Sequence, residues 1–222
     1  MPLDRLETSA RVADRVFDSI HAAIMSGEIA AGERLRIRDL SAQLGTSVMP
    51  VREAIRRLEE LGLAEAVPYR GAVVREFTPD DLMNIYAVRR LLEVDATVRG
   101  AHLYPADGIL ALEAELSAMR AAAESGDVIE YLERDEAFLS LIYAAAGNHV
   151  LVETIRILWT RCRTYKTLGV RHELETGNQT ELLTHQDRLL HAVAANDPQR
   201  AGRITEESLD AATRRISDAF PD

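Results

Sequence analysis

Positively charged side chains are concentrated in one short stretch of this chain. Residues 34–57 contain six arginines and only two acidic residues. Within this stretch, the spacing of apolar residues predicts a helix that begins near Ser47, and it places Arg52 and Arg56 on one face, four positions apart. Guanidinium groups near the start of a helix can donate hydrogen bonds to DNA phosphates or to guanine edges in the major groove. The stretch therefore has the chemistry of a DNA contact.

Three short helices and a hairpin are expected to position these side chains. Apolar residues four apart (Val12, Val16, Ile20 and Ile24) predict the first helix. A second helix is expected over 37–44, stopped by Gly45, and a third runs from the N-cap Ser47 to Gly62. Alternating or β-branched residues at 63–67 and 72–75 flank a Pro-Tyr-Arg-Gly turn. Two helices joined by a glycine turn and followed by a hairpin indicate a winged helix-turn-helix.

The predicted DNA contacts lie on three of these elements. Arg38 lies in the second helix, and Arg70 lies at the hairpin tip. The others follow from the N-cap of the third helix: Ser47, Val48, Met49, Arg52 and Arg56. The alternative for any one arginine is an ordinary solvated helix face. Fixed spacing across the whole stretch favours DNA binding.

Residues 21–74 resemble the DNA-binding domain of GntR-family bacterial regulators. The matching residues are Gly27, Ile29, Gly32, Leu35, Leu40, Gly45, Ser47, Pro50, Val51, Arg52, Glu53, Ala54, Leu58, Gly62 and Gly71. The resemblance implies DNA contacts at Arg38, Ser47 and Arg52. Family members usually carry Arg-Thr where this chain has Val48-Met49, so base specificity should differ here. We expect Val48 to meet a thymine methyl group.

Everything after Pro79 is predicted to be helical. Six segments carry apolar residues three and four positions apart, separated by short breaks rich in glycine, asparagine or proline. The fold is therefore expected to be mainly α, with an N-terminal winged helix-turn-helix domain (1–77) followed by an all-α antiparallel helical bundle (78–222).

Residues 80–215 resemble the all-helical FCD type of effector-binding domain found in the FadR-like branch of the same family. The matching segments are 86–93, 135–138 and 146–148, followed by His185, Gln186, Leu190, Ala192, Val193, Asp197, Pro198 and Ala201. Many members of this type bind a divalent metal through one aspartate and three histidines. Asp135 and His185 match that set, whereas Leu139 and Ser208 replace two of the histidines. Two protein ligands are too few for a tight site, so we expect no cofactor and a metal only if Asp135 and His185 find further ligands.

Four polar residues interrupt the apolar stripes of the predicted bundle: Arg89, Asp135, His185 and Ser208. Buried charges need a partner or a ligand. One interpretation is a pocket in which Arg89 and His185 bind a small carboxylate effector. The other is an internal ion pair of Asp135 with Arg89 or His185 that holds the helices in register.

Enzyme chemistry is the weaker interpretation of the same residues. Asp135, His185 and Ser208 have the types of a catalytic triad, and Cys162 is a conceivable nucleophile. No glycine pattern of a nucleophile elbow surrounds Ser208, and Cys162 lies on an apolar stripe. We therefore expect no catalytic residues. A bundle that only dimerises and binds no effector remains the alternative function.

Charge divides the 222-residue chain unevenly. The formal net charge is −10. Residues 1–76 have 11 arginines and 12 acidic residues, a net charge of −1, and the rest of the chain carries −9. The single cysteine excludes an intrachain disulfide, and neither an apolar signal sequence nor a membrane span is apparent. We expect a cytoplasmic, homodimeric transcriptional repressor without membrane contact. Its partners would be a pseudo-palindromic double-stranded operator and a small carboxylate effector.

Overall fold

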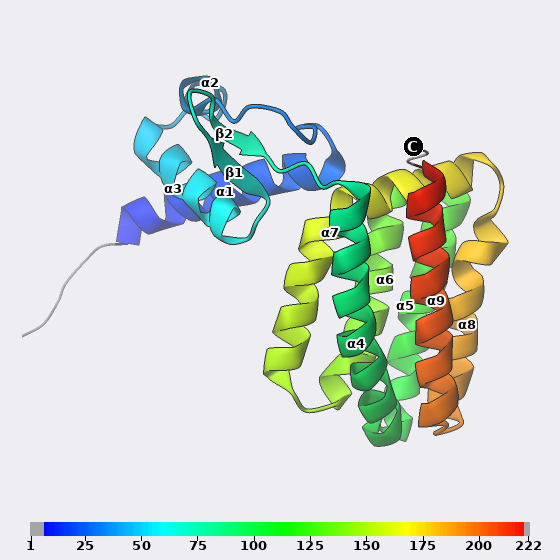
Figure 1. Ribbon diagram of the computed structural model, residues 1–222. Coiled ribbons are helices and arrows are strands. Elements are labelled where there is room, and N and C mark those ends of the chain that lie inside the picture. The colour runs from blue at the N-terminus through cyan, green and yellow to red at the C-terminus, as the bar shows by residue number, and fades with distance from the viewer. Residues whose placement is uncertain (1–6, 220–222) are drawn as a thin grey trace, which may run out of the picture. The chain divides into compact units, whose positions relative to one another are not determined.

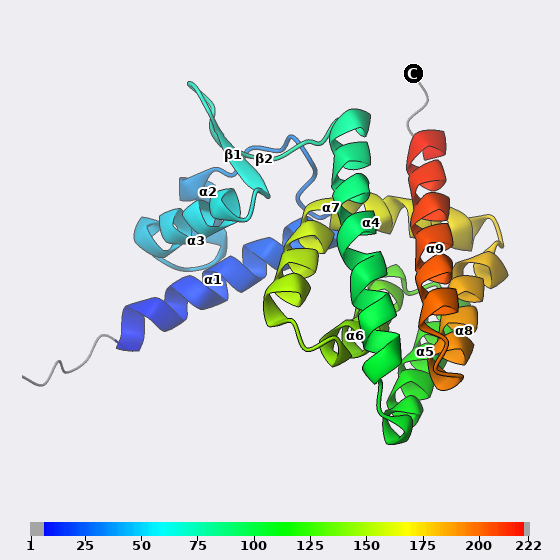
Figure 2. The same cartoon turned by 60° about the horizontal axis from the view of Figure 1, so that its bottom comes forward.

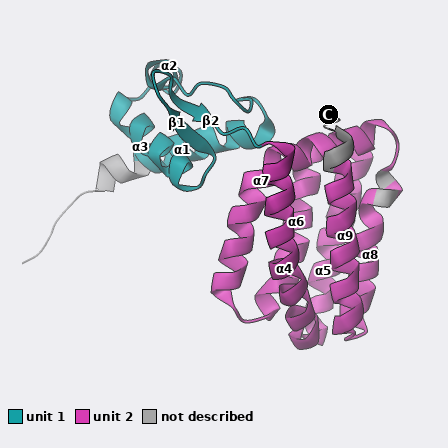
Figure 3. Ribbon diagram, in the orientation of Figure 1, with its two compact units in different colours: residues 1–77 teal, residues 78–222 magenta. Residues whose placement is uncertain are grey.

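The computed structural model describes the backbone of residues 7–219 and the side chains of 12–215, except those of 179 and 181. The chain divides into two compact units, Met1–Phe77 and Thr78–Asp222 (Figure 3). Each unit has a hydrophobic core of its own. The two are described separately below.

The first unit is built on three helices and a two-stranded hairpin. Its elements are α1 (Glu7–Ser26), α2 (Ile37–Gln43), α3 (Val48–Glu60), β1 (Ala64–Val67) and β2 (Gly71–Val74). Helix α1 packs against α3, and their apolar stripes form most of the core, with Val16, Ile20, Ile24, Val51, Ile55 and Leu58 at most 5% exposed. The predicted winged helix-turn-helix is confirmed.

Residues 32–35 extend the hairpin into a small three-segment wing. Strands β1 and β2 pair antiparallel, with Ala64 opposite Val74, and Arg34 forms an isolated bridge with Val73. The backbone N–H of Val74 donates to the Glu33 carbonyl at 2.8 Å. Tyr69 lies in the turn with a positive φ of 64° and a fully exposed side chain. The wing is thus fixed at its base and projects its turn into solvent.

The second unit is a bundle of long helices (Figures 1 and 2). They are α4 (Pro79–Leu103), α5 (Ile109–Ser125), α6 (Val128–Ala145), α7 (His149–Glu175), α8 (Gln179–Ala194) and α9 (Pro198–Ala219), with a 3-10 turn at Ala106–Gly108. Thr78 and Asp81 form a reciprocal capping box at the start of α4. The predicted helical bundle is confirmed. None of the helices in the described part of the chain is long and apolar enough to cross a membrane.

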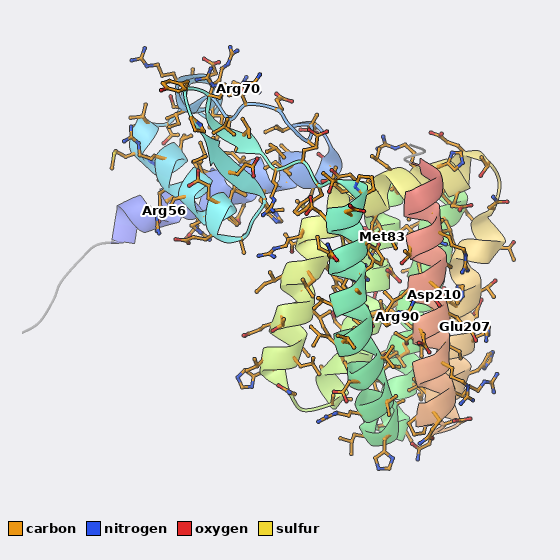
Figure 4. All side chains as sticks on the ribbon, in the orientation of Figure 1. Arg56, Arg70, Met83, Arg90, Glu207 and Asp210 are labelled. Carbon is orange, nitrogen blue, oxygen red and sulfur yellow. The ribbon has the colours of Figure 1, made fainter. Side chains whose placement is uncertain are left out.

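Helix α4 packs against α6, α7 and α9. Two glycines allow its close contacts: a Cβ on Gly100 would lie 2.0 Å from the Ile142 carbonyl oxygen of α6, and one on Gly202 of α9 would lie 2.6 Å from Val98. On the surface, Arg90 of α4 pairs with Asp210 of α9 (Figure 4). Arg90 also pairs with Glu206 of the same helix at 2.9 Å. Because the α4 backbone packs this closely against α6 and α9, the points from which its side chains enter the bundle are fixed.

Candidate functional site

The start of helix α3 presents an uncovered polar and apolar surface. Ser47 has the extended backbone of an N-cap residue, but its side chain makes no capping hydrogen bond. Val48 is 40% exposed and Met49 is 66% exposed. The first amides of a helix lack partners within the helix and favour anions. The Ser47 hydroxyl and these amides are thus available to a phosphate, with two apolar side chains beside them.

The arginines of this unit differ in whether they already have partners. Arg56, exposed on α3, is held by Glu53, with an Nε to Oε2 distance of 3.2 Å, and also pairs with Glu60 (Figure 4). Arg57 pairs with Asp14 at 2.7 Å and lies 4.1 Å from the Phe17 ring centroid, so it fastens α3 to α1. Among the described residues, Arg38, Arg52 and Arg70 form no ion pair and are exposed. These three guanidiniums can bind an external anion without losing a partner inside the protein.

The second unit contains a cavity between its helices. Its lining includes all four polar residues singled out from the sequence, Arg89, Asp135, His185 and Ser208, together with Leu139. Helices α4, α6, α8 and α9 each contribute one of the four. The space open to the centres of water-sized molecules is about 70 Å³. At about 10–15 Å³ for each water, the cavity has room for a few waters or a small organic molecule.

Arg89 forms its ion pair with a residue that sequence reasoning did not select. Its Nε lies 2.6 Å from Oε1 of Glu93, one helical turn away, and both side chains are buried. Glu93 also accepts hydrogen bonds from Trp159 Nε1 at 2.9 Å and from the Tyr143 hydroxyl at 3.1 Å. Burial alone would lower the pKa of Arg89, but the Glu93 carboxylate raises it well above its ordinary value. The suggested pairing of Asp135 with Arg89 is therefore wrong, because Glu93 occupies that role.

Asp135 has two other partners at the cavity. Its Oδ2 lies 3.3 Å from Lys166 Nζ of α7, and its Oδ1 accepts a hydrogen bond of 2.8 Å from Gln186 Nε2 of α8. Burial opposes the charged form of Lys166, but the carboxylates of Asp135 and Glu136 keep its pKa above the ordinary value. Lys166 is the only lysine in the chain, and that was the one signal in the sequence that could have identified it. Lys166 and Gln186 join α6, α7 and α8 around one carboxylate.

The residues present do not fit the divalent metal of many FCD domains. Leu139 lines the cavity without a donor atom, and both oxygens of Asp135 already accept from nitrogen donors. The described residues contain no group of three or more histidine, cysteine, aspartate or glutamate side chains able to hold a metal ion. Among the described residues, the cation that faces Asp135 is the Lys166 ammonium group.

Cys162 has no access to a substrate. Its side chain is fully buried, lies 3.6 Å from the Arg89 guanidinium and donates to the Trp159 carbonyl at 3.4 Å. It is therefore part of the packing behind the Arg89–Glu93 pair.

Comparison with known proteins identifies both units. Residues 12–74 match the family model described as "Bacterial regulatory proteins, gntR family", and residues 84–211 match the FCD domain. The chain is 30% identical over 194 residues to the "Probable D-xylose utilization operon transcriptional repressor" of Paenarthrobacter nicotinovorans, covering 87% of this chain and 84% of the relative. It is 29% identical to the HTH-type transcriptional regulator McbR of Escherichia coli K12, over 78% of each chain. The solved structure of E. coli McbR/YncC superposes with a TM-score of 0.78 at 25% identity, covering 94% of this chain and 98% of that one.

Proposed function

The chain belongs to the GntR family of bacterial transcriptional regulators and carries an FCD domain, and from this premise we propose that it is a repressor controlled by a small organic acid. Its family models and relatives describe regulators, so its function is DNA binding rather than catalysis. The repressor assignment is supported by the relative from Paenarthrobacter nicotinovorans, which is described as a repressor. We place the protein in the cytoplasm, where a bacterial regulator meets its operator.

The DNA contacts are assigned to the start of α3 and its flanks. Arg38, Arg52 and Arg70 supply unpaired guanidiniums, Ser47 and the first α3 amides supply phosphate donors, and Arg56 contributes once it leaves its glutamates. Val48 and Met49 contact base edges or methyl groups. In a homodimer two such surfaces read the two halves of a pseudo-palindromic operator.

The charge of the bundle cavity is the observation that carries the effector assignment. Three permanent cations line it, Arg89, Lys166 and Arg215, against the two carboxylates of Glu93 and Asp135. With His185 neutral, the lining has one surplus positive charge. Glu136, which lies 3.8 Å from Lys166, is itself paired with Arg163 at 2.7 Å and leaves this surplus unchanged. A cavity with a surplus positive charge favours a small monoanion over a neutral or cationic ligand. Asp135, His185 and Ser208 shape the same cavity, and no metal ion takes part.

Effector control requires that the acid bind the DNA-free and DNA-bound forms with different affinities. The test is a thermal unfolding series with a panel of small monocarboxylates, followed by gel-shift titration on the promoter DNA of the protein's own gene. We expect a stabilising acid to raise Tm with increasing concentration and to weaken operator binding. If every acid leaves both Tm and operator affinity unchanged, the bundle is a dimerisation module without an effector. If DNA is not bound, the repressor assignment itself is wrong.

A further inference from the structure

One polar atom at the cavity has no partner within the protein. Gln186 is 8% exposed, and its Oε1 is buried without a hydrogen bond in the described part of the chain. The orientation of the amide is fixed, because its other end faces Asp135 at 2.8 Å and a carboxylate only accepts hydrogen bonds. The nitrogen must therefore face Asp135, which leaves the oxygen as an acceptor without a donor.

Two tyrosine donors that line the cavity are already engaged. The Tyr131 hydroxyl donates to the Leu182 carbonyl at 3.1 Å, and the Tyr143 hydroxyl donates to Glu93. Burial raises the pKa of both tyrosines, so these hydroxyls stay protonated and keep their acceptors. A buried acceptor without a donor is unfavourable, and a ligand that brings a donor removes this penalty. Gln186 is among the residues that line the cavity, so a molecule bound there lies beside its amide group.

The charge and size of the cavity restrict which chemical group of a bound molecule can donate a hydrogen bond to Gln186 Oε1. An ammonium donor would add a cation to a lining that already has a surplus positive charge from Arg89, Lys166 and Arg215. A hydroxyl group donates a hydrogen bond without adding charge, and the carboxylate of the same molecule balances the surplus positive charge of the lining. The space open to water-sized molecules, about 70 Å³, suits a ligand of only a few heavy atoms.

We propose that Gln186 Oε1 accepts a hydrogen bond from a hydroxyl group of the effector, so that the cavity selects a small hydroxy-substituted monocarboxylate over the same acid without the hydroxyl. This inference rests on the proposed function, because it specifies the acid that the bundle binds. Gln186 is then a specificity-determining residue. Lys166 and Asp135 position its amide by holding Nε2 away from the ligand.

The test compares matched acids by isothermal titration to the intact protein. The probes are glycolate, acetate and methoxyacetate, together with 2-hydroxybutyrate, 3-hydroxybutyrate and butyrate. Methoxyacetate keeps the oxygen of glycolate but has no proton to donate. We expect at least one hydroxy acid to bind at least about tenfold more tightly than its unsubstituted partner, and methoxyacetate to bind no better than acetate.

A Gln186→Met variant should abolish this preference, with the hydroxy and plain acids binding equally. Gln199→Met is the matched control, because Gln199 is exposed on α9, and it should keep the wild-type ratio. The ether comparison on the wild-type protein decides the question even if Gln186→Met does not fold. Equal binding of all the acids in a series overturns this inference and leaves the proposed function standing. Binding of none of them overturns both this inference and the effector assignment, and leaves the DNA-binding assignment standing.

Discussion

The Lys166 ammonium lies 3.3 Å from the Asp135 carboxylate, the residue that matches the aspartate of the metal-binding set in many FCD domains. The same carboxylate accepts a hydrogen bond from Gln186 on its other oxygen. A fixed cation supplied by the chain can neutralise this buried carboxylate without any metal. The cavity is therefore assembled by the protein's own side chains.

Metal removal should consequently leave the protein unchanged. We expect EDTA, Zn²⁺ and Ni²⁺ to leave Tm of the wild-type protein where it is, because Asp135 has no free oxygen and Leu139 has no donor atom. The matched variant combines Leu139→His, Ser208→His and Lys166→Met, which restores the four-ligand set and frees Asp135. That variant should be stabilised by Zn²⁺. A stoichiometric metal in the purified wild-type protein would contradict the prediction.

The ion pair of Lys166 should make stability depend on pH on the alkaline side. The pKa of Lys166 is raised above its ordinary 10.5 in the folded protein. The contribution of the ion pair to the free energy of unfolding is therefore fully present below the pKa of lysine in the unfolded chain. It is lost as pH rises through the pKa of Lys166 in the folded protein. We expect no loss between pH 7 and 9 from this pair, and a loss above about 10.5. Because the chain has a single lysine, selective ¹⁵N-lysine labelling gives one side-chain Nζ resonance whose titration measures this pKa directly. A midpoint below 10.5 would refute the assignment.

Loss of the Glu93 charge should be costly. Glu93→Gln leaves the Arg89 guanidinium buried without its carboxylate and weakens the bonds from Trp159 and Tyr143. We expect the free energy of unfolding to fall by about 3–5 kcal/mol, measured by urea titration. Asp95→Asn is the control, because Asp95 pairs with Arg99 on the same helix and at the same spacing, but in solvent. It should cost about 0–1 kcal/mol. Equal effects of the two substitutions would exclude the buried network as a source of stability.

The two arginines on the α3 face should contribute unequally to DNA binding. Arg52→Ala should weaken operator binding by about 1–3 kcal/mol, or reduce the salt slope by about 1 if Arg52 contacts a phosphate. Arg56→Ala should have a smaller effect, because Arg56 must first leave Glu53 and Glu60. Gel-shift titrations over a range of salt concentrations measure both, with circular dichroism as the check on folding. A larger loss from Arg56→Ala would reverse this ranking.

The contact between α4 and α6 should tolerate no side chain at Gly100. Gly100→Ala places a Cβ 2.0 Å from the Ile142 carbonyl oxygen, so the helices must move apart. We expect a loss of about 3 kcal/mol in the free energy of unfolding. Gly169→Ala is the control, since a Cβ there meets no atom within 4 Å, and it should stabilise α7 by up to about 1 kcal/mol. A neutral Gly100→Ala would show that α4 and α6 pack less closely than described.

The helices and the wing were predictable because their signals are local. Apolar spacing located α1 and α3, whose apolar stripes form most of the core of the first unit. The cavity residues Arg89, Asp135, His185 and Ser208 were found as polar interruptions of apolar stripes, and they do line one cavity. Lys166 and Gln186 were missed, because one polar residue on a stripe does not reveal which other helix supplies its partner. Glu93 was missed although it follows Arg89 by four residues on the same helix, a spacing that could have identified the pair.

The sequence by itself determined the two-part architecture, the family, the exposed start of α3 and the four-helix origin of the cavity. Those features depend on periodicity, capping and fixed spacing along a single segment. Only the tertiary structure decided which charges are paired across helices, above all Asp135 of α6 with Lys166 of α7. The physical reason is that an ion pair depends on distances of 3–4 Å, and rotation of a packed helix by a few tens of degrees exchanges one partner for another.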